Sequence, residues 1–122
     1  MKMRIQGNAI RLRLNRREFE QFSGEGRVND SIRFPAGGAL NYRVERTATA
    51  QAVEAAYSAG EITIRVPHPV AKHWAESDEV GISVANGGLE IVIEKDFQCM
   101  HKGAGARDPE AFPNPLAGHE PD

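Results

Sequence analysis

The stretch Ile10-Arg11-Leu12-Arg13-Leu14 decides the fold, and its pattern returns 52 residues later as Ile62-Thr63-Ile64-Arg65-Val66. In both stretches apolar side chains alternate with polar ones. This alternation is typical of a strand that buries one face and exposes the other. Residues 40–44, 80–84 and 89–93 alternate in the same way. The sequence therefore predicts a mainly β protein.

The order of elements around these two strands also repeats. The first half predicts strands over residues 3–6, 10–14, 27–34 and 40–46, with a helix over residues 16–22. The second half predicts strands over residues 52–57, 62–66, 79–85 and 89–95, with a helix over residues 70–76. At the offset of 52, Phe22 aligns with Trp74, Val28 with Val80 and Ile32 with Val84. We predict a tandem ββαββ repeat, residues 1–46 and 52–95, that shares one core in a single domain of residues 1–96.

Turn and helix signals agree with this order. Asn15 and Glu18 have the spacing of a capping box, which predicts that the first helix begins after Asn15. Pro69 is typical of the first turn of a helix and marks the start of the second one. We interpret His68 and His73 as polar residues that flank this helix.

Composition limits the class of protein. The chain has 122 residues, one cysteine and a net charge of −2, which predicts one globular domain without a disulfide. No apolar stretch is long enough to be a signal peptide or a membrane span, so we expect a cytoplasmic protein that does not contact a membrane. The near-zero net charge argues against a general polyanion binder, but residues 1–50 carry ten basic side chains against five acidic ones.

The last 26 residues, 97–122, differ from the rest of the chain. Seven of them are Gly or Pro and no periodicity continues, which predicts an irregular C-terminal tail. Phe97 is expected to continue the packing of the last strand. Phe112–Leu116 is expected to lie in a shallow apolar groove on the domain, either permanently or until a partner displaces it, because a fully disordered segment rarely carries such side chains.

Two segments resemble the AbrB/MazE-type swapped-hairpin family of bacterial regulators and antitoxins. The segment from Arg4 to Leu14, with its Gly7-Asn8 turn before the alternating strand, resembles the opening of the family's domain. The segment Ile62 to Ile93, through Arg65-Val66-Pro67 and Asn86-Gly87-Gly88, is similar to the family's strand end, short helix and closing hairpin. In that family the hairpins of two chains interleave into one barrel. The resemblance therefore implies a fused pseudo-dimer, with both repeats in one swapped-hairpin-like β-barrel with two short helices.

The resemblance also implies a DNA-binding surface, because outward basic residues of the first hairpin contact DNA in that family. The matching positions are Arg4, Asn8 and Arg13, with Arg11 beside them. Independently, Lys2, Arg4, Arg11 and Arg13 form a row of outward cations that suits phosphates. The alternative is a solvated strand face that uses charge to prevent edge pairing. The corresponding positions of the second half are Ala56, Gly60, Thr63 and Arg65, so they keep one basic residue.

The tail supports a second hypothesis. Asp96, Cys99 and His101 carry metal-ligating groups, and Asp108 and His119 follow them, but a closed zinc site usually has four ligands in tighter pairs. We predict no bound metal or cofactor, with Asp96, Cys99 and His101 as the candidates if one binds. No catalytic motif is present, so the sequence predicts a non-enzymatic binding module. It is either a DNA-binding regulator or antitoxin-like protein, or a protein- or metal-binding scaffold whose active part is the tail.

Overall fold

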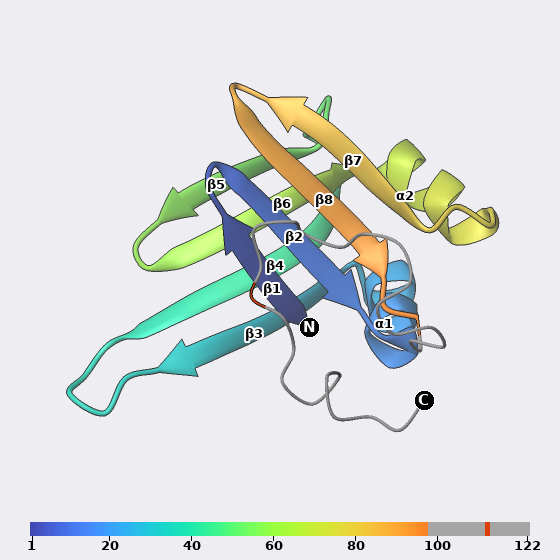
Figure 1. Ribbon diagram of the computed structural model, residues 1–122. Helices are drawn as coiled ribbons and strands as arrows, with labels where there is room; N and C mark the ends of the chain where they lie inside the picture. Colours follow the sequence, from blue (N-terminus) through green and yellow to red (C-terminus); the bar gives the residue numbers. More distant parts are fainter. Residues whose placement is uncertain (98–111, 113–122) are drawn as a thin grey trace, which may run out of the picture.

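The chain forms eight strands and two helices, shown in Figure 1 as a computed structural model that describes residues 1–97 and 112. The strands are β1 (Lys2–Gln6), β2 (Ala9–Leu14), β3 (Arg27–Arg33), β4 (Ala39–Thr47), β5 (Glu54–Ser58), β6 (Glu61–Pro67), β7 (Gly81–Asn86) and β8 (Leu89–Lys95). The helices are α1 (Arg16–Glu25) and α2 (His68–Glu76). The predicted mainly β class with two short helices is confirmed.

Hydrogen bonds divide the strands between two four-stranded sheets. The first sheet has the order β1-β2-β8-β7 and the second has the order β3-β4-β6-β5. The central pairs, β2–β8 and β4–β6, are parallel, and the outer pairs are antiparallel hairpins. Each sheet therefore combines one hairpin from residues 1–46 with one from residues 52–95. The strands of one sheet cross over those of the other (Figure 1).

The strand pairing in the described residues does not close into the single barrel that the resemblance implied. β1 and β7 are the edges of the first sheet, and β3 and β5 are the edges of the second. Among the described strands no edge of one sheet pairs with an edge of the other, so two open sheets face each other. None of the helices described by the structure is long and apolar enough to cross a membrane.

The alternating residues of both sheets meet in one core. The first sheet contributes Leu12, Leu14, Ile91 and Ile93, and the second contributes Val28, Val44, Ile64 and Val66. The ring centroid of Trp74, in α2, lies 4.8 Å from that of Phe19 and 6.1 Å from that of Phe22, both in α1. Both pairs have edge-to-face geometry. These aromatic contacts join the two helices at one end of the sheets (Figure 1).

The ends of α1 follow from its sequence. The predicted capping box is confirmed: the Asn15 side chain accepts a hydrogen bond from the Glu18 N–H, and Glu18 accepts one from the Asn15 N–H. The helix continues to Glu25, three residues beyond the predicted end at Phe22. It stops there because Gly26 adopts φ 93°, a left-handed conformation that suits glycine, and donates its N–H to the Phe22 carbonyl.

The offset of 52 is wrong for β7. Val28 is 4% exposed and faces Val44, but Val80 lies before β7 and is 51% exposed. Ile82 occupies the matching place, because it faces Ile93 across the β7–β8 pair. The shift arises from the connections: the single residue Gly26 links α1 to β3, whereas residues 77–80 link α2 to β7.

β7 packs closely against β8 at Gly81, and a substitution there can test this close approach. A Cβ atom at this position would lie 2.5 Å from the Ile93 carbonyl oxygen and 2.8 Å from the Glu94 Cβ. We expect Gly81→Ala to lower the free energy of unfolding by about 1–3 kcal/mol, because the backbone of β8 must move. Urea unfolding followed by circular dichroism measures the change.

The matched control is Gly24→Ala in α1, where nothing lies within 4 Å of the added Cβ. This change should be neutral or stabilise the protein by up to about 1 kcal/mol, since alanine favours the helix. Equal destabilisation by the two substitutions would contradict the close approach at Gly81.

Candidate functional site

The register of the first hairpin gathers four cations on one face. Lys2 of β1 lies opposite Arg13 of β2, and Arg4 lies opposite Arg11. Opposite residues of an antiparallel pair point to the same side of the sheet. This side is the outer one, because Leu12 and Leu14, which alternate with the two arginines along β2, are buried in the core. We call these four residues, Lys2, Arg4, Arg11 and Arg13, the basic face.

Acidic side chains at the C-terminal end of β8 partly neutralise the basic face. Glu94 lies opposite Arg13 in the parallel pair, and one of its carboxylate oxygens is 2.8 Å from Arg13 Nε and 3.7 Å from Arg11 Nε. Lys2 Nζ lies 2.8 Å from Asp96 Oδ2. Arg4 instead donates a 3.4 Å hydrogen bond to Gln6 and has no ion pair within the described residues. Three of the four cations therefore have a carboxylate partner.

Asn8 has a different position from the four cations. Its side-chain amide donates a 2.7 Å hydrogen bond to the Gly88 carbonyl, and its own carbonyl accepts one from the Glu90 N–H. These bonds join the β1–β2 turn to the β7–β8 turn. The side-chain amide of Asn8, a position that the resemblance matched to DNA contact, thus donates within the protein.

A hollow of about 230 Å³ lies at the turn end of the basic face. Its polar lining consists of Arg4 and Arg11 with Gln6 and Glu90, and its apolar lining consists of Ala9, Ile10 and Val92. The hollow brings together the two arginines that are farthest from Asp96. The carboxylate of Glu90 adds an acidic group at its edge.

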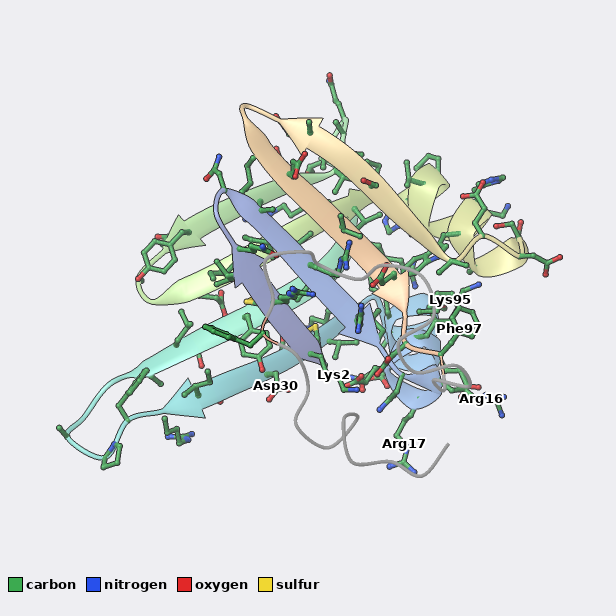
Figure 2. All side chains as sticks on the ribbon, in the orientation of Figure 1. Lys2, Arg16, Arg17, Asp30, Lys95 and Phe97 are labelled. Carbon is green, nitrogen blue, oxygen red and sulfur yellow. The ribbon has the colours of Figure 1, made fainter. Side chains whose placement is uncertain are left out.

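Two further cations that the sequence analysis did not select lie beyond the end of β2. Arg16 and Arg17 are exposed and begin α1 directly after β2 and Asn15, as Figure 2 shows. Both lie in the first helical turn, where the helix dipole disfavours positive charge. The sequence could have identified both cations, because they closely follow the strand predicted over residues 10–14.

The outer face of the second sheet has a different charge pattern. Arg43 Nη2 is 3.0 Å from Glu61, and the Arg65 guanidinium lies 3.6 Å from Glu45 and 3.8 Å from Glu54. Thr63 takes the position that corresponds to Arg11, and it is buried among these longer side chains. The outward arginines of β4 and β6 are therefore paired with carboxylates, and the exposed Arg27 and Arg33 lie on the same side at the β3 edge.

The tail residues are described in part. Cys99, His101, Asp108, Leu116 and His119 lie outside the described residues. Asp96 is described and pairs with Lys2, and no group of three potential metal ligands occurs among the residues that the structure covers. Phe97 is 62% exposed and Phe112 is 96% exposed, so the expectation that these two side chains pack on the domain is wrong.

The ion pair between Lys2 and Asp96 gives a pH-dependent prediction. The hydrogen bond from Lys2, together with its charge, holds the pKa of Asp96 below its ordinary value, although burial acts in the opposite direction. A carboxyl whose pKa is lower in the folded chain stabilises the fold fully above its unfolded-state pKa, about 3.9. This contribution is lost as the pH falls through the lower folded-state pKa. Lys2→Met should therefore raise the pKa of Asp96 and weaken the acid dependence of stability in that window.

Carbon-detected NMR titration of the Asp96 carboxyl measures this shift. The effect on stability should be small, because the Lys2 side chain is 74% exposed and water screens the pair. Arg4→Met is the control, since it removes a neighbouring charge that does not contact Asp96. An Asp96 pKa that does not change in Lys2→Met, or that rises as much in Arg4→Met, would contradict the assigned cause.

Comparison with known proteins gives a family without an assigned activity. No curated protein and no solved structure matches the chain. Residues 1–116 match a family whose description is "Family of unknown function (DUF7009)". Because this match runs through nearly the whole sequence, the chain belongs to the DUF7009 family.

Proposed function

We propose that the protein is a non-enzymatic module that binds DNA through the basic face, as a transcriptional regulator or antitoxin-like protein would. The observation that carries the proposal is the placement of two like-charge pairs, Lys2 opposite Arg13 and Arg4 opposite Arg11. Like charges directly opposite each other across a ladder destabilise a hairpin. Glu94 and Asp96 already offset part of this repulsion, and phosphate groups would offset the rest.

The position of the hairpin favours contact with a duplex. β1 is an edge strand of the first sheet, and Lys2 and Arg4 on its outer side are exposed, so the β1–β2 ribbon is accessible from that side. A two-stranded ribbon fits the major groove of B-form DNA, and several DNA-binding proteins use strands in this way. Arg16 and Arg17 follow β2 directly and would supply further phosphate contacts.

The strand pairing supports the resemblance to the AbrB/MazE group. Each sheet joins a hairpin of the first half to a hairpin of the second, and such an interleaved arrangement is what a fused pseudo-dimer of swapped hairpins requires. We propose that residues 1–46 and 52–95 are the two repeats of this barrel-like unit. The basic face lies on the first sheet. In the second sheet Thr63 stands at the position that corresponds to Arg11. The proposed contact is therefore one-sided.

The carboxylates of β8 would set the strength of binding. Glu94 holds Arg11 and Arg13, and Asp96 holds Lys2. A phosphate must displace or share these partners, which lowers affinity and makes binding weak at high salt. Arg4 has no such competitor among the described residues, so it is the first cation available to a phosphate.

The first test removes the two arginines at the turn end of the basic face. We expect Arg4→Ala/Arg11→Ala to weaken binding of a mixed-sequence DNA duplex roughly tenfold at about 50 mM salt, and to lower the salt dependence by about two phosphate contacts. Stability should not fall, because the substitution also removes a like-charge pair. Fluorescence anisotropy over a salt series measures both quantities.

The matched control is Arg27→Ala/Arg33→Ala, which removes two exposed cations from β3, an edge strand of the second sheet. Affinity should change little in this variant. Absence of DNA binding by the unmodified protein at low salt, or equal losses in the two variants, would contradict the proposal. The alternative scaffold, centred on Asp96, Cys99 and His101, would then be the hypothesis to examine.

A second test changes affinity in the opposite direction. Glu94→Gln frees Arg11 and Arg13 from their carboxylate and should tighten DNA binding severalfold. Glu45→Gln is the control, because Glu45 occupies the matching place in the second sheet, opposite Arg65, and is similarly exposed. Both substitutions should lower stability, but affinity should rise in Glu94→Gln alone. An equal effect of the two on affinity would show that Glu94 does not compete with the duplex.

A further inference from the structure

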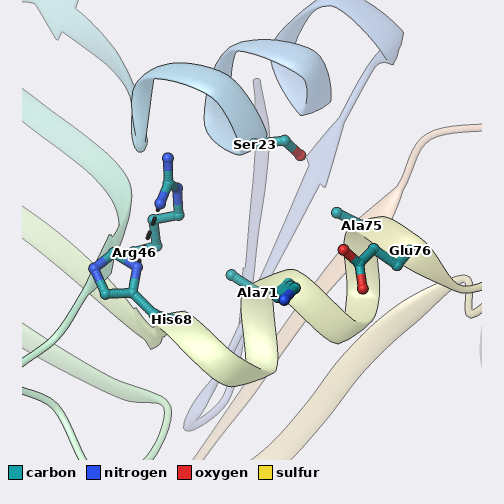
Figure 3. Close-up of a pocket in the computed structure, with 7 residues that line it drawn as sticks. Ser23, Arg46, His68, Ala71, Ala75 and Glu76 are labelled. Atoms are coloured by element: carbon teal, nitrogen blue, oxygen red, sulfur yellow. Dashed lines mark hydrogen bonds between the residues drawn. The ribbon is translucent and has the colours of Figure 1, made fainter.

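A second hollow, separate from the basic face, lies between the two helices. Its volume is about 410 Å³, within the range of pockets that hold small molecules. Figure 3 shows residues of α1, α2 and β4 around it. The lining residues are Ser23, Arg46, His68, Ala71, Lys72, Ala75 and Glu76.

Arg46 is the central cation of this hollow. Its guanidinium donates 3.3 Å hydrogen bonds to the Phe22 and Gly24 carbonyls, at the end of α1, and lies 3.4 Å from His68 Nδ1. Within the described residues no carboxylate lies within ion-pair distance of it. A guanidinium has five N–H groups, and these contacts use three of them. Two donors of a partly buried positive charge therefore remain for a ligand.

The other polar groups around the hollow are also suited to an anion. Arginine can only donate, so His68 Nδ1 is the acceptor in this contact. Lys72 follows His68 by one helical turn and presents a second cation on the same side of α2. α2 also begins without a side-chain cap, because Pro67 occupies the N-cap position. The partial positive charge of this helix end is therefore not offset by a capping side chain.

Ser23 provides an independent sign of a missing partner. Its hydroxyl oxygen is buried and has no hydrogen-bond partner among the described residues, and Ser23 lines the hollow from α1 (Figure 3). A buried hydroxyl without a partner is unfavourable. A ligand oxygen that reaches this hydroxyl would accept a hydrogen bond from it.

We infer that this hollow binds a small organic oxyanion. Arg46 and Lys72 would hold its carboxylate or phosphate head, and Ser23 would donate to one of its oxygens. Ala71 and Ala75 line the hollow with methyl groups, which suit a short apolar body. Glu76 is the one acidic side chain among the described residues that line the hollow, and it repels an anion at its end. The head group therefore lies at the Arg46 end.

The experiment is an NMR titration of the full chain with three probes: benzoate, phenyl phosphate and inorganic phosphate. The expected result is saturable shifts of the backbone amides of Ser23, Arg46 and residues 68–72. Shifts with phenyl phosphate and not with benzoate would support a phosphate head, and shifts with both would support an oxyanion of either kind. Shifts confined to residues 2–13 would overturn the inference, because they would assign the anion to the basic face.

A space-filling variant tests the location without removing Arg46, which also holds the end of α1. Ala75 is exposed on α2 and lines the hollow, so Ala75→Leu should keep the fold and weaken probe binding at least tenfold. The control is His73→Leu, an exposed position of α2 outside the hollow, where binding should be unchanged. Absence of saturable shifts, or equal binding by the protein and Ala75→Leu, would overturn the inference.

Discussion

The two parallel pairs, β2–β8 and β4–β6, are the contacts on which the rest of the structure depends. In the first pair Leu12 lies opposite Ile93, and in the second Val44 lies opposite Ile64. All four side chains are fully buried. Each pair joins a strand of the first half to a strand of the second, so neither half has a complete sheet of its own. The core, the helix contact at Trp74 and the position of the basic face all follow from this exchange.

The sequence pattern was sufficient to predict the strands and helices, but alternation did not predict which strands pair with each other. Alternation in residues 10–14 and 62–66 identifies strands and their buried faces, because the pleat has a period of two. The capping box at Asn15 and the turn glycines mark where elements begin. Pairing between β2 and β8 joins segments about 80 residues apart, and alternation carries no information about that distance. The same limit explains Val80: alternation selected it as a core residue, but the longer connection after α2 leaves it before β7.

The candidate sites follow the same division. The four cations of the basic face were predictable, because they lie on one short hairpin whose register is local. Their neutralisation was not, because Glu94 and Asp96 reach them through the long-range β2–β8 pair. The hollow between the helices was also missed. Its main polar groups, Ser23, Arg46 and His68, come from three separate segments, and His68 was interpreted as a helix-flanking residue.

Comparison of the two sheets separates structural charges from available ones. Arg13 pairs with Glu94 in the first sheet as Arg65 pairs with Glu45 in the second, so this arginine–glutamate pair accompanies the parallel contact in both places. In the second sheet no arginine corresponds to Arg11, because the buried Thr63 stands at that position. Arg4, opposite Arg11, has no ion pair within the described residues, and Arg11 has only the longer contact with Glu94. The fold thus accounts for Arg13, and in part for Arg11 through its 3.7 Å contact with Glu94, whereas a bound polyanion would supply the partner that Arg4 lacks within the described residues.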